Sequence, residues 1–152
     1  MKNQPKPENP KDTIGRTKLP IHLFPPAAIA FGVMGLVEGM LKYGRSNWRA
    51  TPVYATVYYD ALMRHMMAWM ECEDQASDSG NMHLSNAMAT LAIIIDAQTQ
   101  GTLIDDRAYV APGTAGFPGV MEMLKEQLAA LKTLHADKTP HHYSKLDHAR
   151  LQ

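Results

Sequence analysis

Apolar residues recur at helical spacing along the chain and predict four main helices. The stretches are bounded by prolines, glycines and polar capping residues, as helix ends usually are. We expect helices over residues 26–43, 52–71, 82–99 and 120–135. The third carries a predicted core stripe at spacing i, i+4, i+7 and i+11, formed by Leu84, Met88, Leu91 and Ile95. No segment alternates like a strand between hairpin turns, so the predicted fold class is all-α, a compact helical bundle.

The segments outside these helices differ in character. Residues 1–18 are rich in proline, lysine and asparagine and predict an extended N-terminal arm. The helical bundle domain is expected over residues 19–136, and residues 137–152 form a polar tail.

Composition narrows the classes of function. The 152 residues hold 15 Lys and Arg against 15 Asp and Glu, so direct binding to duplex nucleic acid is not expected. The single cysteine excludes an intrachain disulfide and a cysteine-based zinc cluster. The longest apolar run, residues 27–37, is too short to span a bilayer, and the N-terminus lacks the apolar core of a secretory signal. We expect a soluble, cytoplasmic protein without membrane contact.

Four carboxylates crowd the segment between the second and third predicted helices. Glu71, Glu73, Asp74 and Asp78 fall within eight residues. Such groups repel one another, and a divalent cation with oxygen ligands would relieve the repulsion. Glu38 is the one acid on the apolar first helix and could join them. The alternative is an ordinary solvated turn.

The stretch "KYGRSNWR", residues 42–49, combines cations with two aromatic side chains. Bases stack on tyrosine or tryptophan, and lysine or arginine attracts phosphates. Lys42, Arg49 and, on the next helix, Arg64 are therefore candidate phosphate ligands. The alternatives are that Trp48 only anchors the loop and that Lys42 only pairs with Glu38 one turn away.

A second stripe on the third predicted helix is polar rather than apolar. His83, Asn86 and Thr90 recur at i, i+3 and i+7. Uncharged hydrogen-bonding groups in this pattern suit the wall of a pocket, although a capped first turn followed by incidental polar residues would give the same pattern.

Five segments together resemble a known family. "GRTKLPIHLFPP", "KYGRSNWR", "YDALMRHMMAW", "ECEDQASDSGNMHL" and "LIDDR" occur in the order found in the phage dATP/dGTP diphosphohydrolase N-terminal family, which is similar to MazG-like all-α nucleotide pyrophosphohydrolases. The resemblance covers about residues 15–107. It implies a homo-oligomer, a dimer or tetramer, acting in the cytoplasm of a phage-infected bacterium. The implied reaction is Mg²⁺- or Mn²⁺-dependent hydrolysis of purine deoxynucleoside triphosphates to the monophosphate and pyrophosphate.

The resemblance also implies roles for particular residues. The expected catalytic residues are Glu73, Asp78 and His83, and the expected metal ligands are Glu38, Glu73, Asp74 and Asp78. The expected nucleotide-binding residues are Lys42, Tyr43, Asn47, Trp48, Arg49, Arg64, His65, Asp106 and Arg107.

The chain departs from the family pattern at several positions. Ala76 stands where an acid is expected, and Asn86 and Thr90 stand where the family often has histidine and asparagine. The broader Glu-x-x-Glu pattern has no clean copy. A non-catalytic phage module that binds nucleotides or proteins on the same helical scaffold is therefore the alternative function.

Overall fold

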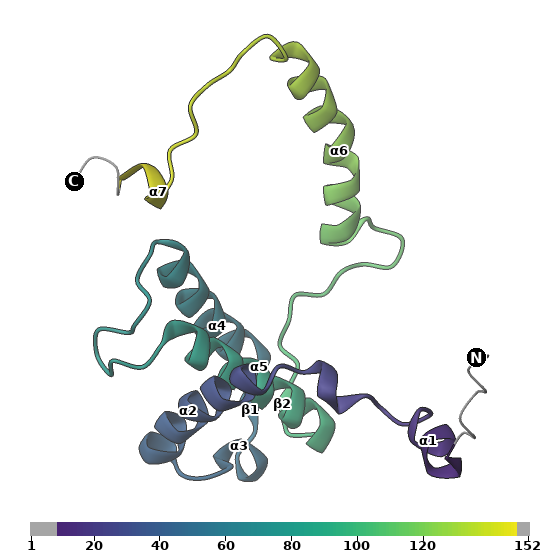
Figure 1. Ribbon diagram of the computed structural model, residues 1–152, viewed down its shortest axis with the longest axis vertical. Helices are drawn as coiled ribbons and strands as arrows, with labels where there is room; N and C mark the ends of the chain where they lie inside the picture. Colours follow the sequence, from purple (N-terminus) through teal and green to yellow (C-terminus); the bar gives the residue numbers. More distant parts are fainter. Residues whose placement is uncertain (1–8, 149–152) are drawn as a thin grey trace, which may run out of the picture. The chain divides into compact units, whose positions relative to one another are not determined.

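The computed structural model describes residues 9–148 and divides the chain into two compact units, Met1–Ile104 and Asp105–Gln152. Figure 1 follows the elements along the chain. In the first unit they are α1 (Pro10–Gly15), the 3-10 turn η1 (Ile21–Leu23), α2 (Pro26–Tyr43), α3 (Asn47–Ala50), β1 (Val53–Tyr54), α4 (Ala55–Met70), α5 (His83–Gln100) and β2 (Leu103–Ile104). The second unit holds α6 (Gly116–Leu134) and α7 (Lys145–His148). The predicted all-α class is confirmed. The expected domain boundaries after residues 18 and 136 stay predictions.

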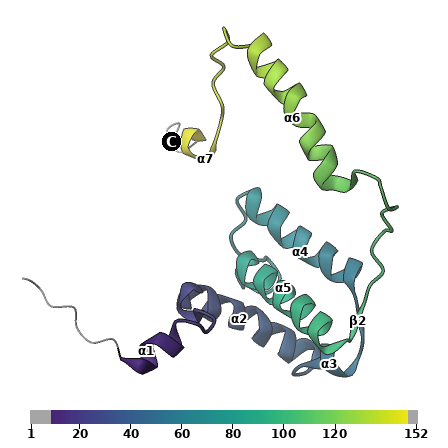
Figure 2. The same cartoon turned by 90° about the vertical axis from the view of Figure 1, so that its right-hand side faces the viewer.

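Helix α5 is the central element of the first unit and packs against both α2 and α4 (Figure 2). Its buried side chains are small or polar: His83, Ser85, Ala87, Ala89 and Ala97. The buried residues of α2 are likewise small, Gly32 and Gly35. A Cβ atom added at Gly35 would lie 2.4 Å from the Ser85 carbonyl oxygen and 2.8 Å from the Ala89 Cβ. The two helix backbones therefore approach closely, which only glycine allows at this point.

The prediction that Leu84, Met88, Leu91 and Ile95 form a core stripe is wrong for three of these four residues. Leu84, Leu91 and Ile95 are 38%, 45% and 64% exposed, so the stripe does not form the core of the described chain. The small residues on α5 allow closer backbone packing than leucine would, and they take the face that contacts α2 and α4. Of the predicted stripe, only Met88 faces α2, where its Sδ lies over Gly32, whereas Leu84, Leu91 and Ile95 are left outward.

The second predicted helix begins later than expected because residues 53–54 are extended. They pair in parallel with Leu103–Ile104, with Val53 opposite Leu103. This short pairing, which the sequence did not predict, ties the start of α4 to the end of α5. Gly44 and Gly101 follow α2 and α5 with positive φ angles of 92° and 74°, as expected for glycines that end helices.

The expected extended arm contains a short helix within its described part. Asn9 caps α1, its side chain accepting a hydrogen bond from the Lys11 backbone N–H at 3.0 Å, and Pro10 follows at the first helical position. Residues 1–8 of the arm lie outside the described residues. None of the helices within residues 9–148 combines the length and apolar character needed to cross a membrane.

Candidate functional site

A cavity of about 420 Å³ opens between α2, α4 and α5. This volume is within the range of sites for small molecules and cofactors. The lining residues come from these three helices and the α3 turn: Gly35, Leu36, Glu38, Gly39, Lys42, Tyr43, Asn47, Trp48, Val57, Tyr58, Ala61, His65, Asn86, Ala89, Thr90 and Ile93. Five predicted nucleotide-binding residues are among them, as are Asn86 and Thr90 of the predicted polar stripe.

One end of the cavity is charged and centres on Glu38. The Lys42 ammonium donates to Glu38 Oε1, and three neutral groups donate to Oε2: the amides of Asn81 (3.0 Å) and Asn86 (3.2 Å) and the Ser79 hydroxyl (3.2 Å). Burial acts to raise the pKa of Glu38, but the hydrogen bonds from Lys42, Asn81 and Asn86 outweigh it and lower the pKa to about 2. Glu38 is therefore ionised at neutral pH.

The acidic loop between α4 and α5 does reach Glu38, as the sequence suggested, but through its neutral residues. The side chains of Ser79 and Asn81 bind Glu38, and the cap position of α5 is Met82. The negative charge of Asp78 acts on Lys42 and helps to raise its pKa, after the larger effect of Glu38. Within residues 9–148 no three side chains of the His, Cys, Asp or Glu type come close enough together to hold a metal ion.

Two histidines lie beside this charged end. His65 Nδ1 and His83 Nδ1 are 2.9 Å apart, so the N–H of one ring donates to the other. Burial, followed by the neighbouring His83, lowers the pKa of His65 and keeps it neutral at neutral pH. The Nε2 atom of His83 is buried without a hydrogen-bond partner among the described residues and lies 3.5 Å from Glu73 Oε1.

A second cavity of about 350 Å³ contains the predicted catalytic residues. It is lined by Ala61, Arg64, His65, Ala68, Glu73, Ala76, Ser77, Asp78 and His83. Glu73, Asp78 and His83 are therefore brought together, with Arg64 beside them, and His65 lines both cavities. Ala76, the departure from the family pattern, is buried in this wall. Asp74 lines neither cavity.

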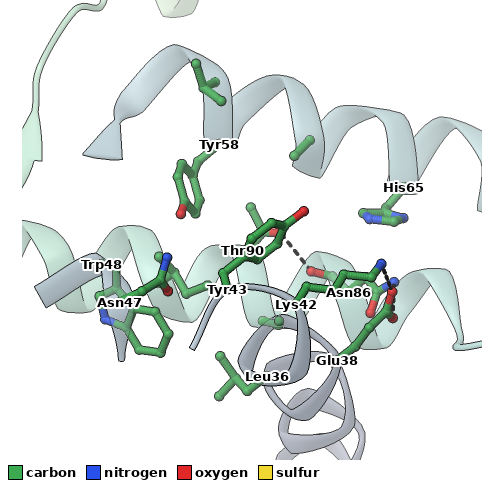
Figure 3. Close-up of a pocket in the computed structure, with 16 residues that line it drawn as sticks. Leu36, Glu38, Lys42, Tyr43, Asn47, Trp48, Tyr58, His65, Asn86 and Thr90 are labelled. Carbon is green, nitrogen blue, oxygen red and sulfur yellow. Dashed lines mark hydrogen bonds and ion pairs between the residues drawn. The ribbon is translucent and has the colours of Figure 1, made fainter. Parts of the chain in front are cut away.

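The other end of the first cavity is aromatic. Figure 3 shows Asn47, Trp48 and Tyr58 toward one end and Glu38, His65 and Asn86 toward the other, with the Tyr43 ring between them. Burial raises the pKa of the Tyr58 hydroxyl, which is therefore neutral at neutral pH. The cavity thus has one end suited to a planar apolar group and one suited to charge.

Asp96 on α5 holds the α3 turn in place at the aromatic end. Its Oδ2 accepts hydrogen bonds from Trp48 Nε1 at 2.6 Å and Arg49 Nε at 2.7 Å, and its Oδ1 accepts one from Arg49 Nη2 at 2.7 Å. Hydrogen bonds from Arg49 and then Trp48 lower the pKa of Asp96. Arg49, a predicted phosphate ligand, is therefore engaged with Asp96 and does not line the cavity.

Two predicted nucleotide ligands belong to the second unit. Asp106 and Arg107 follow the boundary at Asp105, and the Arg107 guanidinium makes a two-pronged ion pair with the Asp105 carboxylate at 2.6 and 2.7 Å. Their role toward a nucleotide stays a prediction.

Sequence reasoning missed Asp96, Tyr58 and the roles of Ser79 and Asn81. A usable signal was present for Asp96, which is the only Asp, Glu, Lys or Arg between His83 and Gln100. The same feature, a lone acid on an apolar helix, had drawn attention to Glu38.

The fold and the site define an all-α protein with a cavity of ligand size, charged at one end and aromatic at the other. The model of the dATP/dGTP diphosphohydrolase, N-terminal family matches residues 8–107, and the chain belongs to this family. A protein of Salmonella phage PMBT28 described as a dATP/dGTP diphosphohydrolase is 29% identical over 105 residues, which are 69% of this chain and 34% of that protein. The chain thus spans about a third of the length of this relative. No solved structure matches.

Proposed function

We propose that the chain binds purine deoxynucleoside triphosphates in the cavity between α2, α4 and α5 and hydrolyses them to the monophosphate and pyrophosphate. The proposal rests on one observation: in a member of this family, the cavity has an aromatic end and a charged end. The base would lie at the aromatic end, against Tyr43 and Trp48. The phosphates would lie at the other end, within reach of Lys42 and of Arg64 in the adjoining cavity.

In the proposed reaction, a water oxygen bonds to the α-phosphorus while the bond to the bridging oxygen breaks and pyrophosphate leaves. Glu73, Asp78 and His83 gather in the adjoining cavity, and we assign to them the proton released by the water. Lys42 would stabilise charge on the phosphates as the bond breaks.

Mg²⁺ or Mn²⁺ belongs to this proposal as an ion shared with the nucleotide. A lone ionised carboxylate at a phosphate-binding end would repel the ligand unless a cation lay between them. Mg²⁺ in proteins is commonly held by one or two carboxylates plus substrate phosphates. Glu38 fits that description, whereas the predicted four-carboxylate set is not assembled within residues 9–148. When bound, the ion would neutralise phosphate charge.

The test is to incubate the purified chain with each deoxynucleoside triphosphate and Mg²⁺ and to separate the products by ion-exchange chromatography. We expect dATP and dGTP to yield the monophosphate and pyrophosphate in equal amounts, and EDTA to stop the reaction. Release of single phosphates instead, or turnover that is unchanged by EDTA, would contradict the proposal.

A non-catalytic nucleotide-binding module is the second candidate. It is favoured by the absence of a three-ligand metal cluster within residues 9–148 and by Ala76 in the wall that holds Glu73 and Asp78. Binding of dATP or dGTP in calorimetry, with no product in the chromatographic assay, would select this candidate over the enzyme.

We also propose a homo-oligomer, a dimer or tetramer, because large apolar side chains remain outward on the described helices. On α5 these are Leu84, Leu91 and Ile95, the stripe at core spacing, and on α4 they include Met63, Met67 and Met70. Large apolar side chains exposed along one face of a helix, as at these spacings, are typical of an interface.

Introducing a charge into this stripe should dissociate the oligomer. Ile95→Glu is expected to reduce the mass measured by light scattering at micromolar concentration to that of one chain, because a carboxylate would have to be buried in the interface. Gln100→Glu adds the same charge at an exposed position of the same helix, five residues after Ile95 and so on another face, and should leave the mass unchanged. A wild-type chain that is monomeric in this measurement would contradict the proposal.

A further inference from the structure

Asn47 is the hydrogen-bonding amide at the aromatic end of the first cavity. Its side chain lines the cavity next to Trp48 and across from Tyr58 (Figure 3). Within residues 9–147 its carboxamide makes no hydrogen bond, whereas the amides of Asn81 and Asn86 at the charged end both bind Glu38. A half-buried amide without a partner, in a cavity wall, is available to a ligand.

A carboxamide can match either purine. It offers an acceptor oxygen and a donor NH₂ side by side. The edge of adenine presents a donor at N6 and an acceptor at N1, and the edge of guanine presents an acceptor at O6 and a donor at N1. These two patterns are the reverse of each other. A half-turn of the amide therefore converts a match for adenine into a match for guanine without any other movement.

The amide can act in this way only if the backbone of Asn47 has a fixed position, and α3 is not stable enough by itself to fix it. It is a helix of four residues, too short to be stable alone, and it follows Ser46 in the left-handed region at φ 55°. Asp96 supplies the restraint, because its carboxylate accepts three hydrogen bonds from Trp48 and Arg49, the two residues after Asn47. Asp96 itself does not line the cavity.

Resting on the proposed function, we propose that Asn47 reads the edge of the purine and accepts both adenine and guanine by turning its amide, and that Asp96 is the positioning residue that holds it there. This assigns base recognition to one rotatable side chain.

The decisive variant is Asn47→Asp. A carboxylate can only accept, so it matches the two donors of guanine at N1 and N2 and repels the N1 acceptor of adenine. The probes are the α,β-methylene analogues of dATP and dGTP with Mg²⁺, titrated by calorimetry. We expect the wild type to bind the two within about tenfold of each other. The variant should shift their affinity ratio toward guanine by roughly tenfold, because it keeps a two-pronged contact with guanine and replaces the one with adenine by a repulsion.

Inorganic tripolyphosphate serves as the control ligand because it has no base. Its affinity should be the same in the wild type, Asn47→Asp and Asp96→Asn. Asp96→Asn keeps an acceptor for Trp48 but loses the charge pair with Arg49, so we expect both analogues to weaken by the same factor, severalfold, with their ratio unchanged. A purely structural role for Asp96 would instead weaken tripolyphosphate binding as well.

The outcomes separate this inference from the proposed function. Binding of both analogues to the wild type, with an unchanged ratio in Asn47→Asp, overturns base reading by Asn47 and leaves the proposed function standing. If the wild type binds neither analogue, both fail. If Asn47→Leu binds both analogues as tightly as the wild type does, the amide has no role.

Discussion

Replacing Gly35 with alanine is expected to destabilise the first unit by about 2–3 kcal/mol and to lower its melting temperature by roughly 10 °C or more. The added Cβ would meet the Ser85 carbonyl oxygen at 2.4 Å and the Ala89 Cβ at 2.8 Å. The nearest atom is backbone, so no side-chain rotation can relieve the clash, and α2 would have to move away from α5. Thermal unfolding followed by circular dichroism measures the effect.

Two other glycines of α2 provide matched controls. Gly39→Ala meets nothing within 4 Å, so alanine's higher helix propensity should leave the melting temperature unchanged or slightly raised. Gly32→Ala meets the Met88 Sδ at 2.8 Å, and because that side chain is flexible we expect an intermediate loss. If Gly35→Ala and Gly39→Ala had the same melting temperature, the result would contradict a close approach of α2 and α5 at Ser85.

The helices could be predicted from the sequence, but the surface along which they pack could not. Apolar periodicity and the bounding glycines placed α2 at its observed limits and α5 within one residue at each end. The same periodicity depends mainly on large apolar side chains, so it predicted wrongly that Leu91 and Ile95 lie in the core. The seam is instead made by Gly35, Ser85 and Ala89, because close backbone approach depends on small residues, which an apolar pattern does not distinguish.

The candidate site was predictable where it depended on neighbouring residues and not where it depended on distant ones. Lys42 one turn after Glu38 follows directly from helical spacing. The contacts of Asp96 with Trp48 and Arg49 join positions 48 and 47 residues apart, and nothing local in the sequence indicates them. The acidic loop reached Glu38 as expected, but its neutral donors make the contacts because they satisfy the ionised carboxylate, whereas further carboxylates would repel it.

Replacing Glu38 with glutamine is expected to lower kcat for dATP and dGTP by at least about 100-fold. Glu38 is the only carboxylate that lines the first cavity within the described residues, and it is ionised because its pKa is about 2. Glutamine preserves the shape and one acceptor oxygen, but it removes the charge that pairs with Lys42 and that would hold a nucleotide-bound cation. Steady-state kinetics with Mg²⁺ measure the loss. Glu71→Gln makes the same charge change at an exposed position that lines neither cavity, and should keep full turnover.

The pH dependence of the free energy of unfolding tests separately whether the Glu38 carboxylate is held in its ionised form. Because the folded pKa of Glu38 is lowered from 4.5 to about 2, its ionised form stabilises the fold above pH 4.5, and this contribution is lost as the pH falls from about 4.5 toward 2. In urea unfolding, the wild type should therefore exceed Glu38→Gln in stability near neutral pH, and the difference should shrink across that window. If Glu38→Gln kept full turnover, Glu38 would have no role in the proposed reaction. A stability difference that did not change with pH would instead show that the carboxylate is not held in its ionised form by Lys42, Asn81 and Asn86.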